Sequence, residues 1–440
     1  MGSNGTTDSQ IVITGIGIVS PVGIGLEPFT AALKEQKSGV KPMELLSVSA
    51  APGNVGGEVS NFTEQDARKE YLKPLKKSVK VMCREIQLGV AAALQAVENS
   101  KLDLDSIDHT RFGVEFGANL MFSPPWVLQD ACWKCTEESE NGPVFKFDEW
   151  GEKGLVAMEP LWLLCYLPNM PACHIGISMD ARGPSNSMTV DEASGNLVLG
   201  EAMSIIDRGW ADIMIAGTTG TRINPVKSIH GLFWDNLGQN EGDPATWSRP
   251  FDKDRNGQVL AEGGGSFILE TDAHAKARGA KIWGRLLGSG ASCVADDKGL
   301  GHTREALARA MTGALQKAGL KPADIGHINA HGLGEVIADR YEAAAIHDVF
   351  GDVASTVPVT SLKSYWGNPG ASCGSLELAG SLVGLDEGVV LPTLNFTAQS
   401  PDDPPLNIVH GSPLPVDNKV VLNINVTRQG QASAIIVDAG

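Results

Sequence analysis

The sequence predicts an α/β protein built from two similar halves. Strand-like and helix-like segments alternate along the chain, which is typical of sheets covered by helices. Two short apolar strands, ADIMIAGTTG at 211–220 and IGHINAHGLG at 325–334, resemble one another, and both end in glycine-rich turns. We therefore expect a mostly parallel sheet in each half. The second half begins near residue 270, so the halves cover 11–269 and 270–440.

The first element is an apolar strand, IVITGIGIVSPVG at 11–23, and a helical pattern then continues to about Lys37. Its glycines miss the third glycine of the dinucleotide-binding fingerprint, and no strand ending in an acid follows at the required distance. We expect no nicotinamide, no flavin and no other cofactor. The segment 78–100 places apolar residues at helical spacing, with small residues that allow close packing, and predicts a core helix.

Residues 123–160 interrupt the alternation. They are richer in Pro, Trp, Glu and Gly and show no clear period, so we expect an excursion that forms a lid, a dimer contact or a substrate-lining loop. Cys132 and Cys135 form a CxxC in this segment, which reads as a loop. Because no second pair follows at zinc-binding spacing, the CxxC is weak evidence for metal or redox chemistry, and no metal site is predicted.

Composition excludes several classes of protein. The 440 residues carry a formal net charge of −17, which argues against nucleic acid as the main partner. No apolar run reaches the roughly 18 residues of a membrane span. The start, MGSNGTTDSQ, lacks the features of an export signal, so residues 1–10 are expected to be a disordered tail. Seven scattered cysteines indicate reduced thiols, and we expect a cytoplasmic protein.

A basic segment stands out against the negative total charge. Such a run is usually a solvated helix face, and the alternative is a docking surface for an acidic partner. The only acid within the segment is Glu70. Its basic residues are Arg68, Lys69, Lys73, Lys76, Lys77, Lys80 and Arg84.

Two positions are candidates for chemistry. In α/β sheets the ligand site lies beyond the carboxyl ends of the strands, and His331 follows such a strand end in the second half. A lone His is more often structural, but this placement favours a chemical role. The segment MTVDEASGN at 188–196 reads as a strand that turns into a helix, with Glu192 among small residues.

Four segments carry a resemblance to a known family. They are ITGIGIVSPVG at 13–23, WSRPFDKDRNGQVLAEGGGSFILE at 247–270, INAHG at 328–332, and LKS followed by GN at 362–368. The chain resembles the β-ketoacyl-acyl carrier protein synthases, or ketosynthases, of the thiolase superfamily over essentially its whole length. The resemblance implies the duplicated, five-layered α/β/α/β/α thiolase fold and a dimer.

The resemblance also implies a set of site residues. Family members use a nucleophilic Cys at the N-terminus of a buried helix to take an acyl chain from a carrier protein, and two His promote decarboxylation of malonyl-carrier. In GPSNSMTVDEASGN at 183–196, Glu192 stands where that Cys should be. His331 matches the first catalytic His and Lys363 the family's lysine, whereas Asn368 replaces the second His.

Three more residues are assigned to the pocket and its gate by the resemblance. Asp339 and Glu342 follow the INAHG motif, and NVTRQGQAS at 425–433 places Arg428 at the family's gating Phe. His174 in NMPACHIGI matches a His of the family scaffold and should be packed structure. A carboxylate at a helix N-terminus is favoured by the helix dipole, so Glu192 is expected to pair with a protonated His331 or with Arg428.

Three functions stay open. The first is a ketosynthase homologue without the nucleophilic Cys, acting as an auxiliary, chain-length-factor-like subunit of fatty acid or polyketide synthesis. The second is an enzyme with a non-standard acyl-transfer or acid/base activity on Glu192 and His331. The third is a non-catalytic binding module for an acyl group or a carrier protein.

The resemblance implies two kinds of partner. One is a second subunit, in a homodimer or in a heterodimer with an active ketosynthase. The other is acyl carrier protein, which is strongly acidic and would dock on the basic segment. The predicted docking residues are Lys73, Lys76, Lys77 and Lys80.

Overall fold

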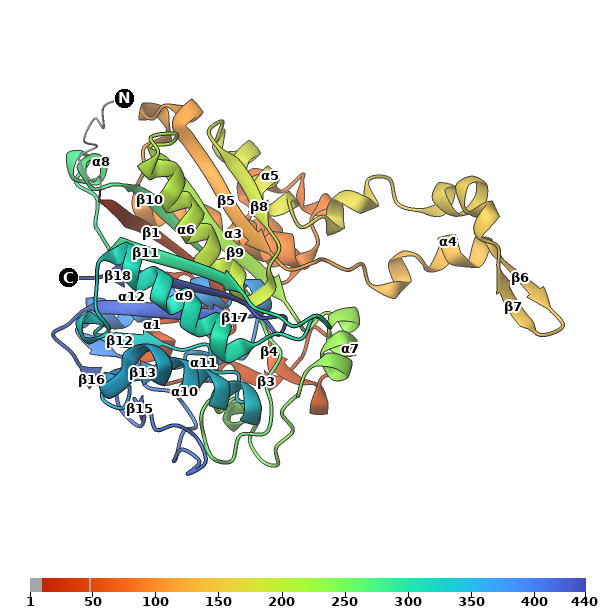
Figure 1. The fold of residues 1–440 in the computed structure, drawn as a ribbon. Helices are drawn as coiled ribbons and strands as arrows, with labels where there is room; N and C mark the ends of the chain where they lie inside the picture. Colours follow the sequence, from red (N-terminus) through yellow and green to blue (C-terminus); the bar gives the residue numbers. More distant parts are fainter. Residues whose placement is uncertain (1–9, 47–48) are drawn as a thin grey trace.

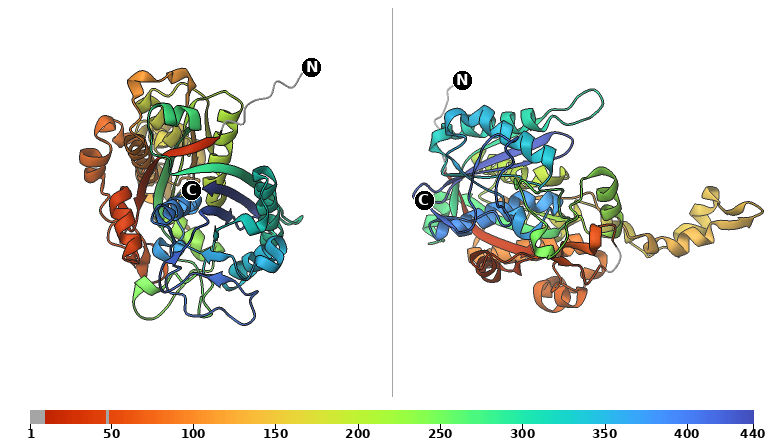
Figure 2. Two further views of the ribbon diagram at one scale, coloured as in Figure 1. Left: turned by 90° about the vertical axis from the view of Figure 1, so that its left-hand side faces the viewer. Right: turned by 90° about the horizontal axis from the view of Figure 1, so that it is seen from below.

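The computed structural model describes residues 10–46 and 49–440, and its body has five layers (Figures 1 and 2). Two helices cover the outer face of the first half of the sheet, two lie between the halves, and two cover the outer face of the second half. This is the predicted α/β/α/β/α arrangement. In that order the helices are α3 (Arg84–Ser100) and α5 (Met170–Met179), α6 (Ser194–Asp207) and α12 (Cys373–Asp386), and α9 (Thr303–Ala318) and α10 (Val336–Phe350).

The main strands form one continuous sheet in the order β15-β13-β12-β17-β18-β11-β1-β10-β9-β5-β8. The first half supplies β1 (Ile11–Ser20), β5 (Phe112–Ala118), β8 (Ser185–Met188), β9 (Ile213–Thr221) and β10 (Glu262–Thr271). The second half supplies β11 (Gly284–Cys293), β12 (His327–Asn329), β13 (Pro358–Thr360), β15 (Asn407–Ile408), β17 (Val420–Val426) and β18 (Gln431–Asp438). The boundary between the two halves near residue 270 stays a prediction.

The expectation of a mostly parallel sheet holds in the second half, where β13 also pairs with β15 in parallel, and it is wrong in the first half, where parallel pairs are no more frequent than antiparallel ones. The outer pairs are parallel: β5 with β8 and β9, and β12 with β13 and β17. The central pairs from β17–β18 through β1–β11 to β9–β10 are antiparallel. The tight turn between β17 and β18 explains one of them, because only antiparallel neighbours can be joined by a short turn.

The glycines of the first strand serve packing. A Cβ on Gly17 would lie 1.9 Å from the carbonyl oxygen of Ala92 in α3, so only glycine allows β1 to approach this helix so closely. The predicted core helix is α3, which begins at Arg84 because residues 79–81 form a separate 3-10 turn. The helix after the first strand is α1 (Leu26–Lys34), which ends three residues before the predicted Lys37.

Residues 123–166 form an arm that extends away from the body, drawn in yellow in Figures 1 and 2. The arm holds α4 (Gln129–Lys134) and a hairpin of β6 (Thr136–Ser139) and β7 (Gly142–Phe145). Cys132 lies in α4, so the interpretation of the CxxC segment as a loop is wrong. Large apolar side chains are exposed along the arm, among them Trp126, Trp133, Phe147, Val156 and Leu161.

The basic segment is not one helix face. It runs through short turns at residues 67–71, 73–75 and 79–81 before α3 begins. Arg84 is partly buried and binds the carboxylate of Glu262, with its Nε 2.7 Å from Oε2. Exposed side chains remain at Lys73, Lys76, Lys77 and Lys80.

The remaining expectations concern single segments. The predicted tail over residues 1–10 lies, apart from residue 10, outside the described residues. His174 is buried in α5, as expected of packed structure. Within the described part of the chain, no helix has the length and apolar character needed to cross a membrane.

Candidate functional site

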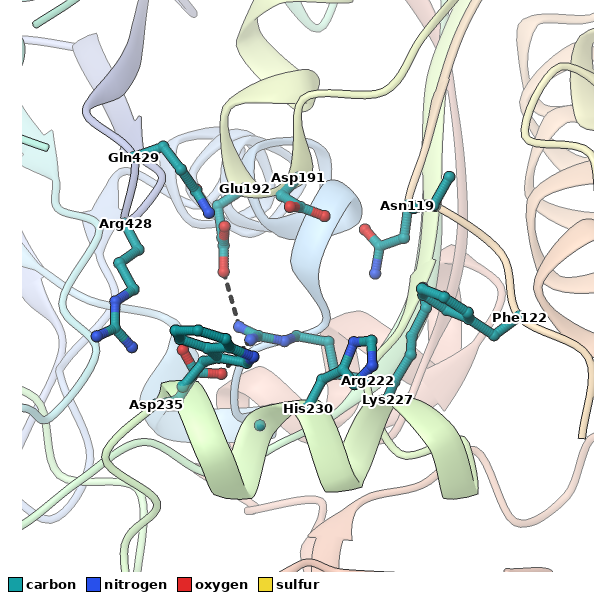
Figure 3. Close-up of a pocket in the computed structure, with 13 residues that line it drawn as sticks. Asn119, Phe122, Asp191, Glu192, Arg222, Lys227, His230, Asp235, Arg428 and Gln429 are labelled. Atoms are coloured by element: carbon teal, nitrogen blue, oxygen red, sulfur yellow. Dashed lines mark hydrogen bonds and ion pairs between the residues drawn. The ribbon is translucent and has the colours of Figure 1, made fainter. Parts of the chain in front are cut away.

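Glu192 lies in a short 3-10 turn (Asp191–Ala193) directly before α6. Its side chain is 11% exposed, and Oε1 accepts hydrogen bonds from Arg222 Nη1 at 2.7 Å and from Asn368 Nδ2 at 3.0 Å. The start of a 14-residue helix favours a negative charge at this place. The Glu192 carboxylate is therefore fixed by a cation, an amide and a helix end. Figure 3 shows its ion pair with Arg222.

Arg222 is the cation that organises this region, and the sequence analysis missed it. It follows β9 directly, at the carboxyl end of a parallel strand, where ligand sites are expected. Its Nη2 binds Asp235, just after α7 (Pro225–Trp234), and its Nη1 also donates to Gln258 Oε1 at 3.1 Å. One guanidinium thus lies between two carboxylates, a geometry that suits its fork of N–H donors.

A second cluster lies around His331 behind this ion pair. Lys363 Nζ, at the start of α11 (Lys363–Trp366), is 3.1 Å from His331 Nδ1 and forms an ion pair with Glu377 of α12. Asn425 Nδ2 lies 3.3 Å from the same ring nitrogen. Since an ammonium and an amide N–H group are both donors, Nδ1 is the acceptor and the proton sits on Nε2.

His331 is neutral in this environment. Burial lowers its pKa well below the usual value, and the positive charges of Lys363 and Arg222 lower it further. The prediction that Glu192 pairs with a protonated His331 or with Arg428 is therefore wrong. Arg222 takes that role, and Arg428 lies exposed in the turn between β17 and β18.

Asp339 and Glu342 hold the loop that carries His331. Glu342 accepts hydrogen bonds from the backbone N–H groups of His331 at 2.6 Å and Gly332 at 2.8 Å, and Asp339 accepts one from Leu333 at 2.9 Å. Burial raises the pKa of Glu342 to about 8 and that of Asp339 to about 6. Both lie on α10 outside the cavity lining, so their assignment to the pocket is corrected to a supporting position.

Asn368 connects the Glu192 region with the start of α12. Its Nδ2 binds Glu192 and also Gln258 Oε1 at 2.6 Å, and its Oδ1 accepts hydrogen bonds from Gly370 N at 3.0 Å and Cys373 Sγ at 3.1 Å. Burial raises the pKa of Cys373, which keeps this thiol protonated. The structure thus joins Glu192 to Asn368 and His331 to Lys363.

Glu192 and Arg222 open into a cavity of about 400 Å³, which we call the outer cavity. Arg428 and Gln429 line one side of it, and Lys227 and His230 reach it from α7 (Figure 3). Asp191, Asp235 and Asn119 complete its polar wall. The cavity therefore presents both signs of charge to a ligand.

Arg222→Met should lower the free energy of unfolding by about 3 kcal/mol, because Glu192 and Asp235 would lose their shared cation. Adding Glu192→Gln should recover about 1 kcal/mol of that loss. Urea unfolding measures both effects. Arg304→Met, at the exposed Arg304–Asp348 pair, is the matched control and should cost less than about 1 kcal/mol. Equal losses in R222M and R304M would contradict the assigned role of Arg222.

Comparison with known proteins agrees with this architecture. Residues 8–275 match the N-terminal domain model of beta-ketoacyl synthase, and residues 284–397 match its C-terminal domain model. The chain is 30% identical to 3-oxoacyl-(acyl-carrier-protein) synthase 2 of Synechocystis sp. over 89% of both chains. It is also 30% identical to the protein of that name from Coxiella burnetii, over 90% of this chain and 89% of the relative.

Two solved structures share the fold. The ishigamide ketosynthase/chain length factor has a TM-score of 0.81 at 26% identity and covers 99% of this chain and 100% of its own. A type II polyketide synthase acyl-carrier protein in complex with its ketosynthase bound to the hexaketide has a TM-score of 0.80 at 25% identity, with the same coverage. The two domain models together span most of the chain, and the protein belongs to the beta-ketoacyl synthase family.

Proposed function

We propose that the protein is an auxiliary, chain-length-factor-like subunit that pairs with an active ketosynthase and performs no condensation itself. The observation that carries this proposal is the state of Glu192, which we infer stands in place of the family's nucleophilic Cys. Its carboxylate is bound by Arg222 and Asn368 at the start of α6. A carboxylate stabilised in this way is a poor nucleophile, and its mixed anhydride with an acyl group would be readily hydrolysed.

Cys373 does not supply the missing thiol. It donates a hydrogen bond to the same Asn368 that binds Glu192, but the thiol is fully buried and its pKa is raised by burial. A protonated, enclosed thiol does not attack a thioester. Decarboxylation of malonyl-carrier is disfavoured as well, because in the family it depends on two His, and we infer that Asn368 stands in place of the second one.

The surface supports assembly with a second subunit of the same fold. Strand β8 ends the sheet order, and its residues Ser185 and Asn186 are exposed, so a row of backbone groups is open to pairing. The base of the arm lies beside this edge, because the Pro168 carbonyl accepts a hydrogen bond from Ser187 Oγ, and the arm itself carries exposed aromatic side chains. The arm is thus best explained as a dimer contact. One of the similar structures is described as a ketosynthase with its chain length factor.

A second candidate is an acid/base activity centred on His331 and Glu192. It is favoured by His331 Nε2, which is buried and has no hydrogen-bond partner in the described part of the chain. The tautomer fixed by Lys363 and Asn425 gives this nitrogen a proton to donate to an oxyanion. In this activity Lys363 orients the imidazole, and Asn368 positions Glu192.

A cytoplasmic location fits both candidates, because all seven cysteines are free thiols. Neither candidate requires a cofactor. The third possibility, a carrier-binding module without turnover and without a ketosynthase partner, is an outcome of the experiment that follows.

The heterodimer is tested by native mass spectrometry of the protein purified from its own cells. We expect a complex with one thiolase-fold chain that has an active-site thiol. Iodoacetamide should alkylate this thiol, and an acyl group bound to the thiol should prevent the alkylation. The reason is that the auxiliary subunit has no nucleophile of its own and depends on one in its partner. A homodimer alone, recovered from cells that contain such a ketosynthase, would rule out the auxiliary role.

We also propose that an acidic carrier protein docks on Lys73, Lys76, Lys77 and Lys80, which are all exposed. A carrier bound to its ketosynthase is seen in one of the similar structures. Reversing Lys76 and Lys77 to Glu should weaken carrier binding about tenfold or more at low salt, where screening is least. Titration calorimetry measures this effect. The control reverses Lys34 and Lys281, which lie exposed elsewhere, and unchanged affinity in the Lys76/Lys77 variant rejects the docking site.

A further inference from the structure

A second cavity of about 200 Å³ lies beside the outer cavity, and we call it the side pocket. Its lining is mainly apolar or aromatic and includes Met121, Phe122, Pro124, Trp126, Tyr166 and Pro225. Phe122 and Lys227 line both cavities, so these two side chains form the wall between them. By its lining alone, the side pocket would suit a linear alkyl chain that enters from the outer cavity.

The wall contains a buried ion pair. Lys227 Nζ lies 3.2 Å from Glu85 Oε2, and the two side chains are 10% and 2% exposed. Glu85, in the first turn of α3, also accepts a hydrogen bond from the backbone N–H of Asn119 at 2.9 Å. Lys227 is therefore anchored to a carboxylate that is itself fixed to the end of β5.

Moving Lys227 aside would be costly. Separating a buried ion pair leaves one charge uncompensated, which costs far more than the pair gains over an apolar replacement. An alkyl chain has no polar atom that could replace the ammonium as the partner of Glu85. A short acyl group does not need the side pocket, because its polar atoms find Asn119, Arg222 and Arg428 in the outer cavity.

We propose that Lys227, anchored by Glu85, is a specificity-determining residue that closes the side pocket to linear alkyl chains. The cavity of Glu192 then accepts short acyl groups and rejects long ones. This proposal rests on the proposed function only in assuming that acyl groups reach the cavity.

The test replaces the ion pair by neutral side chains of similar size, in the double variant Glu85→Gln/Lys227→Met. The probes are the butanoyl and decanoyl thioesters of N-acetylcysteamine, titrated by calorimetry. The affinity for the decanoyl probe should rise about tenfold or more in the variant, because each methylene buried in the opened pocket contributes about 0.8 kcal/mol. The affinity for the butanoyl probe should stay within about threefold.

The control variant is Lys34→Met/Glu387→Gln, which makes the same chemical change at an exposed ion pair and should leave both affinities unchanged. Equal affinity of the wild-type chain for both probes overturns the proposal, and so does a variant that gains no affinity for the decanoyl probe. A crystal structure of the wild-type chain with the decanoyl probe is a check that does not depend on the folding of a variant. Electron density for the decanoyl chain in the side pocket, beyond Lys227, would contradict closure. That result would leave the auxiliary role open, because the auxiliary role is tested separately by the partner found in native mass spectrometry.

Discussion

The ion pair between Glu192 and Arg222 is the interaction on which the rest of the site depends. It lies where β9 ends and α6 begins, between the two halves of the fold. Without Arg222, the helix start would hold Glu192 next to Asp191 and opposite Asp235, three carboxylates around one cavity. With Arg222 present, the charges in the cavity are compensated. The N-terminus of α6, which could lower the pKa of a thiol, instead stabilises the Glu192 carboxylate.

The second cluster, around His331, adjoins this ion pair. Burial lowers the pKa of His331, and the charge of Arg222 helps to lower it and keep the imidazole neutral. The donors and acceptors of the cluster come from α10, α11, α12 and β17, and all of them are buried. The structure thus combines a complete histidine cluster, suited to oxyanion stabilisation, with a neutralised carboxylate at the adjoining helix start. That combination fits a subunit whose fold keeps part of a condensing site while the nucleophile is supplied by a partner.

Much of the fold was predictable, since the sequence motifs that resemble ketosynthases imply the five layers. His331 was identified as a candidate site residue because it follows the end of a predicted strand. The antiparallel centre of the sheet was not predictable, because strand direction depends on contacts between distant segments such as β1 and β11. Glu192 and Asn368 were each identified as departures from the family's pattern, but their contact was not predicted and Arg222 was missed. Its partners lie 30 and 13 positions away in the sequence, on separate elements, and only its place after β9 could have indicated it.

Charge compensation also explains why Arg428 was a poor prediction for the partner of Glu192. The turn between β17 and β18 leaves this side chain exposed at the rim of the cavity, whereas Arg222 approaches from inside the fold. A partly buried carboxylate is stabilised most by a cation that is itself shielded from water.

The central claim is that Glu192 has no covalent or proton-transfer role. Its most direct test is intact-protein mass spectrometry after incubation with acyl- and malonyl-carrier protein, with the released acids and acetyl-carrier measured in parallel. The account predicts no acyl adduct and no product above the level of a Glu192→Gln variant. An adduct on Glu192, or turnover that is lost in the Gln variant with folding intact, would contradict it and identify a working site of a different kind.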